Sequence, residues 1–180
     1  MDNETTNILS AISADPNAGM RRLMKTYGGN IYWHIRRLVV DHEDAQDATQ
    51  ETFIRAFRSL PTFRGDCKLA TWLYRIATNE ALRIVSARRA EDVSIDSTET
   101  GAELLAADSF VDYTNEAGVR LQKAILTLPP KQQLAFNLRY YDDMSFAEMA
   151  QVASSTPDSM KMSYSLAKEK IRRYIETHDL

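Results

Sequence analysis

Apolar residues recur at steps of three and four along the first half of the chain, which is the spacing of amphipathic helices. One apolar stripe falls in a helix expected over residues 43–60, which Pro61 ends, and a second follows shortly after it. No stretch alternates apolar and polar residues as a strand would, so we expect an all-α protein. The stripes are Ala45, Ala48, Phe53, Ala56, Phe57 and Leu60, then Leu69, Trp72, Leu73 and Ile76.

The second half of the chain predicts a helix-turn-helix. Pro129-Pro130 begins a helix that extends to about Tyr141. After a turn, Ser145 and Glu148 have the three-residue spacing of a capping box at the start of a short helix, 146–152. A three-residue turn leads to Thr156, the expected N-cap of a long helix. Its buried stripe is expected to be Met160, Tyr164, Ala167, Ile171 and Tyr174.

The net charge of −3 hides a large difference in charge between segments of the chain. Residues 90–117 hold eight Asp and Glu and no Lys or Arg, whereas the segments on either side are mildly basic. Such a segment buries too little apolar surface to offset the entropy of ordering it. We therefore expect two small helical domains, 1–89 and 118–180, joined by an acidic flexible linker over 90–117.

Composition excludes several functional classes. The single cysteine, Cys67, rules out a disulfide framework and a cysteine-only zinc site. No apolar run approaches the ~20 residues that span a bilayer, and the acidic N-terminus lacks signal-peptide order, so we expect a cytoplasmic protein. His34, His42 and His178 have no ligand spacing, and each is expected to be an ordinary surface or partly buried histidine. We expect no catalytic residues, no metal and no cofactor.

Three surfaces are candidates for binding, each with a plainer interpretation. The 43–60 helix carries acidic residues and one apolar residue, Ile54, on its polar face, which is either simply solvated or a docking surface. Segment 64–89 interleaves basic and aromatic residues around Asn79, which suits single-stranded nucleic acid; otherwise it is a cationic helix face, with Trp72 in the core in either case. The long helix after Thr156 either reads a DNA groove or belongs to an ordinary helical core.

Five short motifs in order resemble the extracytoplasmic-function (ECF) group of bacterial RNA polymerase sigma factors. Residues 44–57 (DAQDATQETFIRAF) resemble the helix of that group that binds core polymerase. Residues 63–66 (FRGD) and 71–79 (TWLYRIATN) resemble its segment that melts and reads the −10 element. Residues 126–133 (LTLPPKQQ) and 145–150 (SFAEMA) resemble the opening of sigma domain 4, which reads the −35 element.

The resemblance implies sigma domain 2, an acidic linker and sigma domain 4 in a non-catalytic subunit. Its partners would be core RNA polymerase, promoter DNA (single-stranded at −10, duplex at −35) and an anti-sigma factor. A stand-alone helix-turn-helix regulator is the alternative. The implied residues are, for core polymerase, Asp47, Gln50, Glu51, Ile54 and Arg58; for −10 DNA, Arg64, Lys68, Leu69, Arg75, Asn79 and Arg83; and for −35 DNA, Ser159, Lys161, Met162, Ser163, Ser165 and Lys168.

Some positions depart from the pattern of that group. The group often has an aromatic residue where this chain has Leu69, and Asp where it has Arg83. In the helix-turn-helix, Ser154 replaces the turn glycine and Ser163 replaces a common arginine. These departures concern promoter preference, so the promoter sequence of other members does not transfer to this chain.

Overall fold

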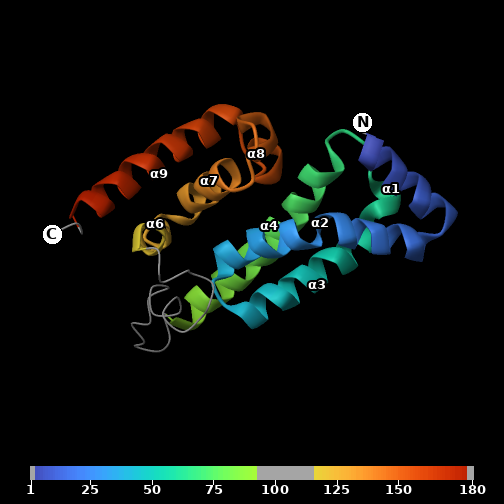
Figure 1. The fold of residues 1–180 in the computed structure, drawn as a ribbon, viewed down its shortest axis with the longest axis horizontal. Helices are drawn as coiled ribbons and strands as arrows, with labels where there is room; N and C mark the ends of the chain where they lie inside the picture. Colours follow the sequence, from blue (N-terminus) through green and yellow to red (C-terminus); the bar gives the residue numbers. More distant parts are fainter. Residues whose placement is uncertain (1–2, 93–115, 178–180) are drawn as a thin grey trace.

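A computed structural model describes residues 3–92 and 116–177, and within these ranges all regular structure is helical (Figure 1). The all-α prediction is therefore confirmed. The N-terminal domain consists of α1 (Asn3–Ala14), α2 (Pro16–Val39), α3 (His42–Ser59), the short 3-10 helix η1 (Leu60–Thr62) and α4 (Leu69–Asp92). The C-terminal domain consists of α6 (Glu116–Leu126), α7 (Pro130–Tyr140), α8 (Phe146–Val152) and α9 (Pro157–Thr177).

The predicted linker is shorter than expected at both ends. Helix α4 continues to Asp92 and α6 begins at Glu116, so helical structure enters the segment 90–117 from each side. The rest of that segment, 93–115, lies outside the described residues.

Helix α2 is the central element of the N-terminal domain, and it packs against α1, α3 and α4. Asp15 caps its N-terminus by accepting a hydrogen bond from the Asn17 backbone N–H, and Pro16 takes the first helical position. Its side toward α4 is fully buried at Ile31, His34 and Ile35. His34 Nε2 lies 2.8 Å from Thr78 Oγ1 on α4, which ties the two helices together inside the core.

The predicted stripe of α3 faces this core with one exception. Ala45, Ala48, Phe53 and Ala56 are buried, as is Trp72 on α4. Phe57, however, is 43% exposed, so its assignment to the core was wrong. At 3.6 residues per turn, Phe57 lies 100° around the helix from Ala56, at the edge of the apolar stripe rather than in its middle.

The C-terminal domain contains the predicted helix-turn-helix. Ser145 and Glu148 form the capping box at the start of α8, and Thr156 Oγ1 accepts a hydrogen bond from the Ser159 backbone N–H at the start of α9. Ser154, in the turn between them, has φ = 48°, the left-handed conformation that explains why a glycine is common at this position. On α9, Met160, Ala167 and Ile171 are buried as expected.

The two domains pack against each other. Figure 1 shows α7 between α9 and the N-terminal domain, and α8 contacts α4. Leu134, Leu138 and Met144 belong to the same buried cluster as Leu73 and Tyr74 of α4. The apolar core is therefore continuous from one domain to the other.

Gly19 allows the close approach of α1 and α2, and its substitution tests that contact. A Cβ at Gly19 would lie 2.5 Å from the Ile12 backbone nitrogen, which forces α1 to move. We expect Gly19→Ala to lower the free energy of unfolding by about 1–3 kcal/mol in a urea titration, as overpacking does. Gly29 is the matched control, because a Cβ there meets nothing within 4 Å. Gly29→Ala should raise stability by about 0.5–1 kcal/mol; a loss at both positions would contradict the proposed contact.

Candidate functional site

An apolar groove runs between α2 and α3. Its cavity measures about 780 Å³. Gln50, Ile54 and Arg58, three residues of the predicted core-polymerase set, line it together with Phe57. Met24, Ile54 and Phe57 are each more than a third exposed, so apolar side chains remain in contact with water here. An apolar groove of this kind, with polar residues at its edges, is typical of a protein-binding surface.

The other two residues of the predicted core-polymerase set lie beside the groove rather than in it. Asp47 is exposed on α3. Glu51 lies on the same face of α3 as Asp47, about 40° around the helix, and lines a polar pocket of about 440 Å³ between α3 and α4. The five residues therefore lie on one face of α3, with the apolar groove along one edge of that face and the polar pocket, which Arg58 also lines, along the other.

Asn79 lies in this polar pocket between α3 and α4. Its neighbour Glu80 has a side chain only 4% exposed, and that carboxylate forms an ion pair with Arg55 at 2.9 Å and accepts a hydrogen bond from Arg83 at 3.2 Å. Arg55 also pairs with Glu51 at 2.9 Å. The pocket thus presents an exposed amide among guanidinium groups that are held in place by carboxylates.

A second polar pocket, of about 390 Å³, is formed by the loop before α4 and the first turns of that helix. The predicted −10 residues Arg64 and Arg75 line it, and Trp72 packs on Phe63 with ring centroids 5.3 Å apart. Cys67 also lines this pocket, and burial raises the pKa of its thiol. Gln151 of α8 completes the wall, so one side of this pocket belongs to the C-terminal domain.

Lys68 and Leu69, the remaining two predicted −10 residues near this pocket, differ in exposure: the Lys68 side chain is 66% exposed, whereas Leu69 is not at the surface. Lys68 Nζ lies 2.7 Å from Glu148 Oε1 of α8. Leu69 is fully buried, so the prediction that it contacts DNA is corrected. Leu69 is the first residue of α4, and its side chain joins the core cluster beneath the loop.

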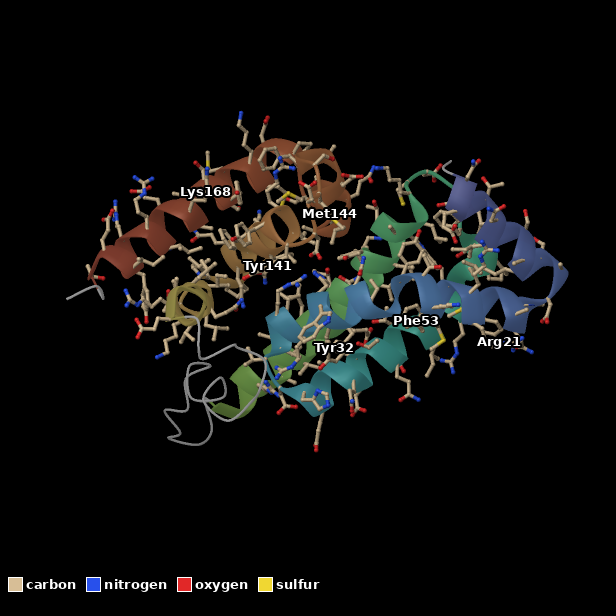
Figure 2. All side chains as sticks on the ribbon, in the orientation of Figure 1. Arg21, Tyr32, Phe53, Tyr141, Met144 and Lys168 are labelled. Carbon is tan, nitrogen blue, oxygen red and sulfur yellow. The ribbon has the colours of Figure 1, made fainter. Side chains whose placement is uncertain are left out.

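Most of the predicted −35 set lies on the outer face of α9. Lys161, Met162, Ser165 and Lys168 are exposed, Met162 by 67%, and Figure 2 labels Lys168 on this helix. Ser159 is half-buried, and its hydroxyl lies 2.8 Å from Lys131 Nζ. Ser163 is 8% exposed, so its assignment to the DNA-facing side is corrected: it lies three residues after Met160, on the buried side of the helix.

Sequence analysis missed a buried polar cluster between the domains. Asp142, in the turn after α7, has a side chain 6% exposed, and its Oδ1 accepts hydrogen bonds from Arg37 Nη2 (2.8 Å) and Tyr74 Oη (3.1 Å). His34 Nδ1 lies 3.4 Å from its Oδ2. Burial and the Asp142 carboxylate raise the pKa of Tyr74, which keeps the phenol protonated as a donor. His34 is fully buried, which corrects the expectation of a surface or partly buried histidine.

The described residues contain neither a cluster that could bind a metal nor a helix that could span a membrane. In residues 3–92 and 116–177, no three His, Cys, Asp or Glu side chains are grouped so that they could hold a metal ion. Among the helices of the same segments, none has the length and apolar character that crossing a bilayer requires.

Comparison with known proteins relates both domains to one family. Residues 23–91 match Sigma-70 region 2 and residues 118–171 match Sigma-70 region 4. The RNA polymerase sigma-H factor of Pseudomonas aeruginosa is 31% identical over 163 residues, which cover 86% of this chain and 84% of that protein. The ECF RNA polymerase sigma factor SigW of Bacillus subtilis is 27% identical over 165 residues, covering 85% and 87%.

Two solved structures share the fold. CnrH, determined in complex with the cytosolic domain of CnrY, superposes with a TM-score of 0.74 at 17% identity, covering 98% of this chain and 100% of that one. The sigma factor RpoE of Bartonella quintana, determined with the anti-sigma factor NepR, has a TM-score of 0.70 at 18% identity, covering 88% and 97%. At these identities the likeness concerns the fold.

The acidic side chain of Glu148 makes stability depend on pH. Its bond to Lys68 and the Ser145 cap lower the pKa of Glu148 from 4.5 to about 2. Because the folded-state pKa is lowered, the ionised group stabilises the fold above pH 4.5, and this contribution is lost as the pH falls from 4.5 toward 2. We expect Glu148→Gln to reduce the free energy of unfolding at pH 6 by about 1 kcal/mol, allowing for solvent screening.

Urea titrations across this pH range check the prediction. The difference between wild type and Glu148→Gln should shrink as the pH falls, whereas Glu176→Gln, at an exposed glutamate near the end of α9, should follow wild type throughout. A difference that stays constant down to pH 2 would show that the charge of Glu148 is not responsible.

Proposed function

Because this chain belongs to the ECF group of RNA polymerase sigma factors, we propose that it contacts core polymerase and promoter DNA through the three surfaces described above. As a sigma factor it directs RNA polymerase to promoters and is a non-catalytic subunit. The two matched regions, one in each domain, carry this conclusion. What the proposal adds is the assignment of residues to partners, with 1–89 and 118–180 as the two functional domains.

Core polymerase binds the groove between α2 and α3 and the acidic face beside it. The exposed apolar residues Ile54 and Phe57 support this assignment, since a groove lined by them loses unfavourable contact with water when a partner covers it. Gln50 and Arg58 form its polar edge, and Asp47 supplies charge next to it. Glu51 lies at the edge of the same face, where it holds Arg55.

Unpaired −10 bases are held along α4. The loop pocket offers aromatic rings and two arginines, which suit a base turned out of the stack. Asn79, one turn beyond Arg75, offers both a donor and an acceptor to a base edge. Arg83 and Lys68 contact phosphates, and Leu69 supports the pocket from below by fixing the start of α4.

The −35 element is read by the outer face of α9, as in other helix-turn-helix proteins. Lys161 and Lys168 have the charge to contact phosphates, and Ser165 can hydrogen-bond to a base or a phosphate. Met162, which is 67% exposed, contacts a thymine methyl or the groove wall. Ser159 lies at the first turn of α9 beside Lys131 and contributes with it.

We assign the protein to the cytoplasm, where polymerase acts, and infer regulation by an anti-sigma factor. The RpoE protein of similar fold was determined with an anti-sigma factor, which supports this partner. Transcription in vitro, with core polymerase, this chain and fragmented DNA from its own organism, tests the function as a whole. Promoter-specific transcripts that need both proteins are expected; a DNA fragment bound tightly without polymerase, and no transcript, would favour a stand-alone regulator.

Substitutions that change the charge in the groove and beside it test the core-polymerase surface. We expect Ile54→Glu and Asp47→Arg each to weaken the complex with core polymerase by about 2–5 kcal/mol, because the new charge is buried without a partner. Pull-down of core polymerase at increasing concentrations of the variant measures this. Leu166→Glu is the matched control, since Leu166 is 42% exposed, close to the 37% of Ile54, but lies on α9. Equal retention by all three variants would contradict the assignment.

The −10 assignment is tested at Asn79. We expect Asn79→Ala to raise the activation free energy of open-complex formation by about 1–3 kcal/mol on promoters with the preferred base at one −10 position. The reason is that a hydrogen-bonded contact to that base is lost. Permanganate footprinting on single-base promoter variants measures the effect, with Ser86→Ala, two turns further along α4, as control. If Asn79→Ala lowers opening equally on every variant, the amide is structural.

A further inference from the structure

The outer side of α9 carries two large apolar side chains that remain in contact with water. Met162 is 67% exposed and Leu166 is 42% exposed, and the two lie one helical turn apart, about 40° around the helix from each other. Figure 1 shows α7 between α9 and the N-terminal domain, so no described helix covers this side. Leu166 belongs to none of the residue sets assigned above to a partner.

The buried residues of α9 determine which way this apolar pair points. Met160, Ala167 and Ile171 are buried on one side of the helix. Met162 lies about 20°, and Leu166 about 60°, from the direction opposite to that buried side. In a helix-turn-helix that binds DNA, the side of the second helix opposite to the core faces the floor of the major groove. Both apolar side chains are therefore directed toward base edges.

Basic residues lie on both flanks of the apolar pair. Lys161 and Lys168 are exposed on one flank, and Lys170 is exposed on the other. Lys131 lies on the second flank as well, because its Nζ is 2.8 Å from the hydroxyl of Ser159 in the first turn of α9. Cations on two flanks suit the phosphates on either side of a groove. This arrangement leaves the apolar strip between them over the bases.

The first three turns of α9 are poor in side chains that read a base by two hydrogen bonds. Residues 157–168 include no Arg, Asn or Gln. The apolar group that the major groove presents is the 5-methyl group of thymine. Contact between this methyl group and an apolar side chain removes both from water. A cytosine in the same place would present an amino group that the apolar side chain leaves without a hydrogen-bond partner.

We propose that Met162 and Leu166 read the 5-methyl groups of two thymines in the −35 element, which makes Leu166 a specificity-determining residue. The proposal rests on the assignment of α9 to −35 DNA made above. Leu166 has fewer rotatable bonds than Met162, and methionine adapts readily to different surfaces. Leu166 therefore discriminates more strictly between thymine and other bases than Met162 does.

Replacement of single thymines by uracil tests the proposal, because this exchange removes only the 5-methyl group and keeps the base pair. The holoenzyme formed by core polymerase and the full chain is bound to a promoter recovered by transcription in vitro. Each thymine of the −35 element, on either strand, is replaced in turn, and competition binding compares each duplex with the unmodified one. We expect binding about threefold to fivefold weaker at two positions, the effect of burying one methyl-sized group.

Substitutions in α9 assign each methyl group to a side chain. Leu166→Ala should abolish the effect of uracil at one of the two positions, and Met162→Ala should abolish it at the other. Leu166→Arg should change the preferred base at its position from thymine to guanine by about tenfold or more, because a guanidinium pairs with O6 and N7 of guanine. Lys168→Ala is the matched control: it should weaken binding to all duplexes by the same factor and leave both uracil effects unchanged.

Two results would overturn the proposal: equal binding of the thymine and uracil duplexes at every −35 position, or uracil effects that persist in both Leu166→Ala and Met162→Ala. Circular dichroism checks that the variants keep the fold of wild type. Replacement of the whole −35 element separates this proposal from the assignment on which it rests. If that replacement weakens binding and uracil does not, α9 still reads the −35 element and only the methyl contacts fail. If that replacement has no effect, the assignment of α9 itself fails.

Discussion

The arrangement of the two domains depends on the need to compensate one buried carboxylate. Asp142 lies in a short turn, where a carboxylate is ordinarily solvated, yet in this fold it is enclosed. An unpaired charge in such a place would cost several kcal/mol, so Arg37 and Tyr74 must be present whenever the domains dock. Docking must therefore bring this carboxylate to these partners, while apolar residues of both domains are buried around it.

Local signals in the sequence were sufficient for most of the helices and for the helix-turn-helix. The N-cap Ser145 locates the start of α8, and Thr156 followed by Pro157 locates the start of α9. These signals act within one turn of the chain, so both helix starts could be predicted closely. The same kind of signal, Asp15 before Pro16, marks the start of α2. The candidate surfaces were predictable to the level of helix faces. Asp47, Ile54, Asn79, Lys161 and Met162 all lie at the surface, as a polar or outward position implies.

The predicted burial was wrong for residues at the edge of a helix face and for residues whose burial depends on a segment distant in the sequence. Phe57, Leu69 and Ser163 each lie next to the boundary between a buried and an exposed face, where spacing alone does not determine burial. His34 and Asp142 could not be paired from sequence, because 108 positions separate them and turn residues such as Asp142 are usually solvated. A histidine inside an apolar helical stripe, with Ile31 and Ile35 around it, is the one signal that could have indicated a buried polar contact.

The sequence separation of the interdomain bonds sets an order of events during synthesis. Arg37 and Asp142 are 105 positions apart, whereas the helix packing of the N-terminal domain is complete by residue 92. At about 5–20 residues per second, a ribosome needs roughly 3–10 s to add the fifty residues that separate the end of α4 from Asp142. During that interval the nascent N-terminal domain has the pocket before α4 without its Gln151 wall and has Arg37 without the Asp142 carboxylate. In each new molecule the N-terminal domain is therefore present before the C-terminal domain can dock on it. The speed of translation determines the length of that interval.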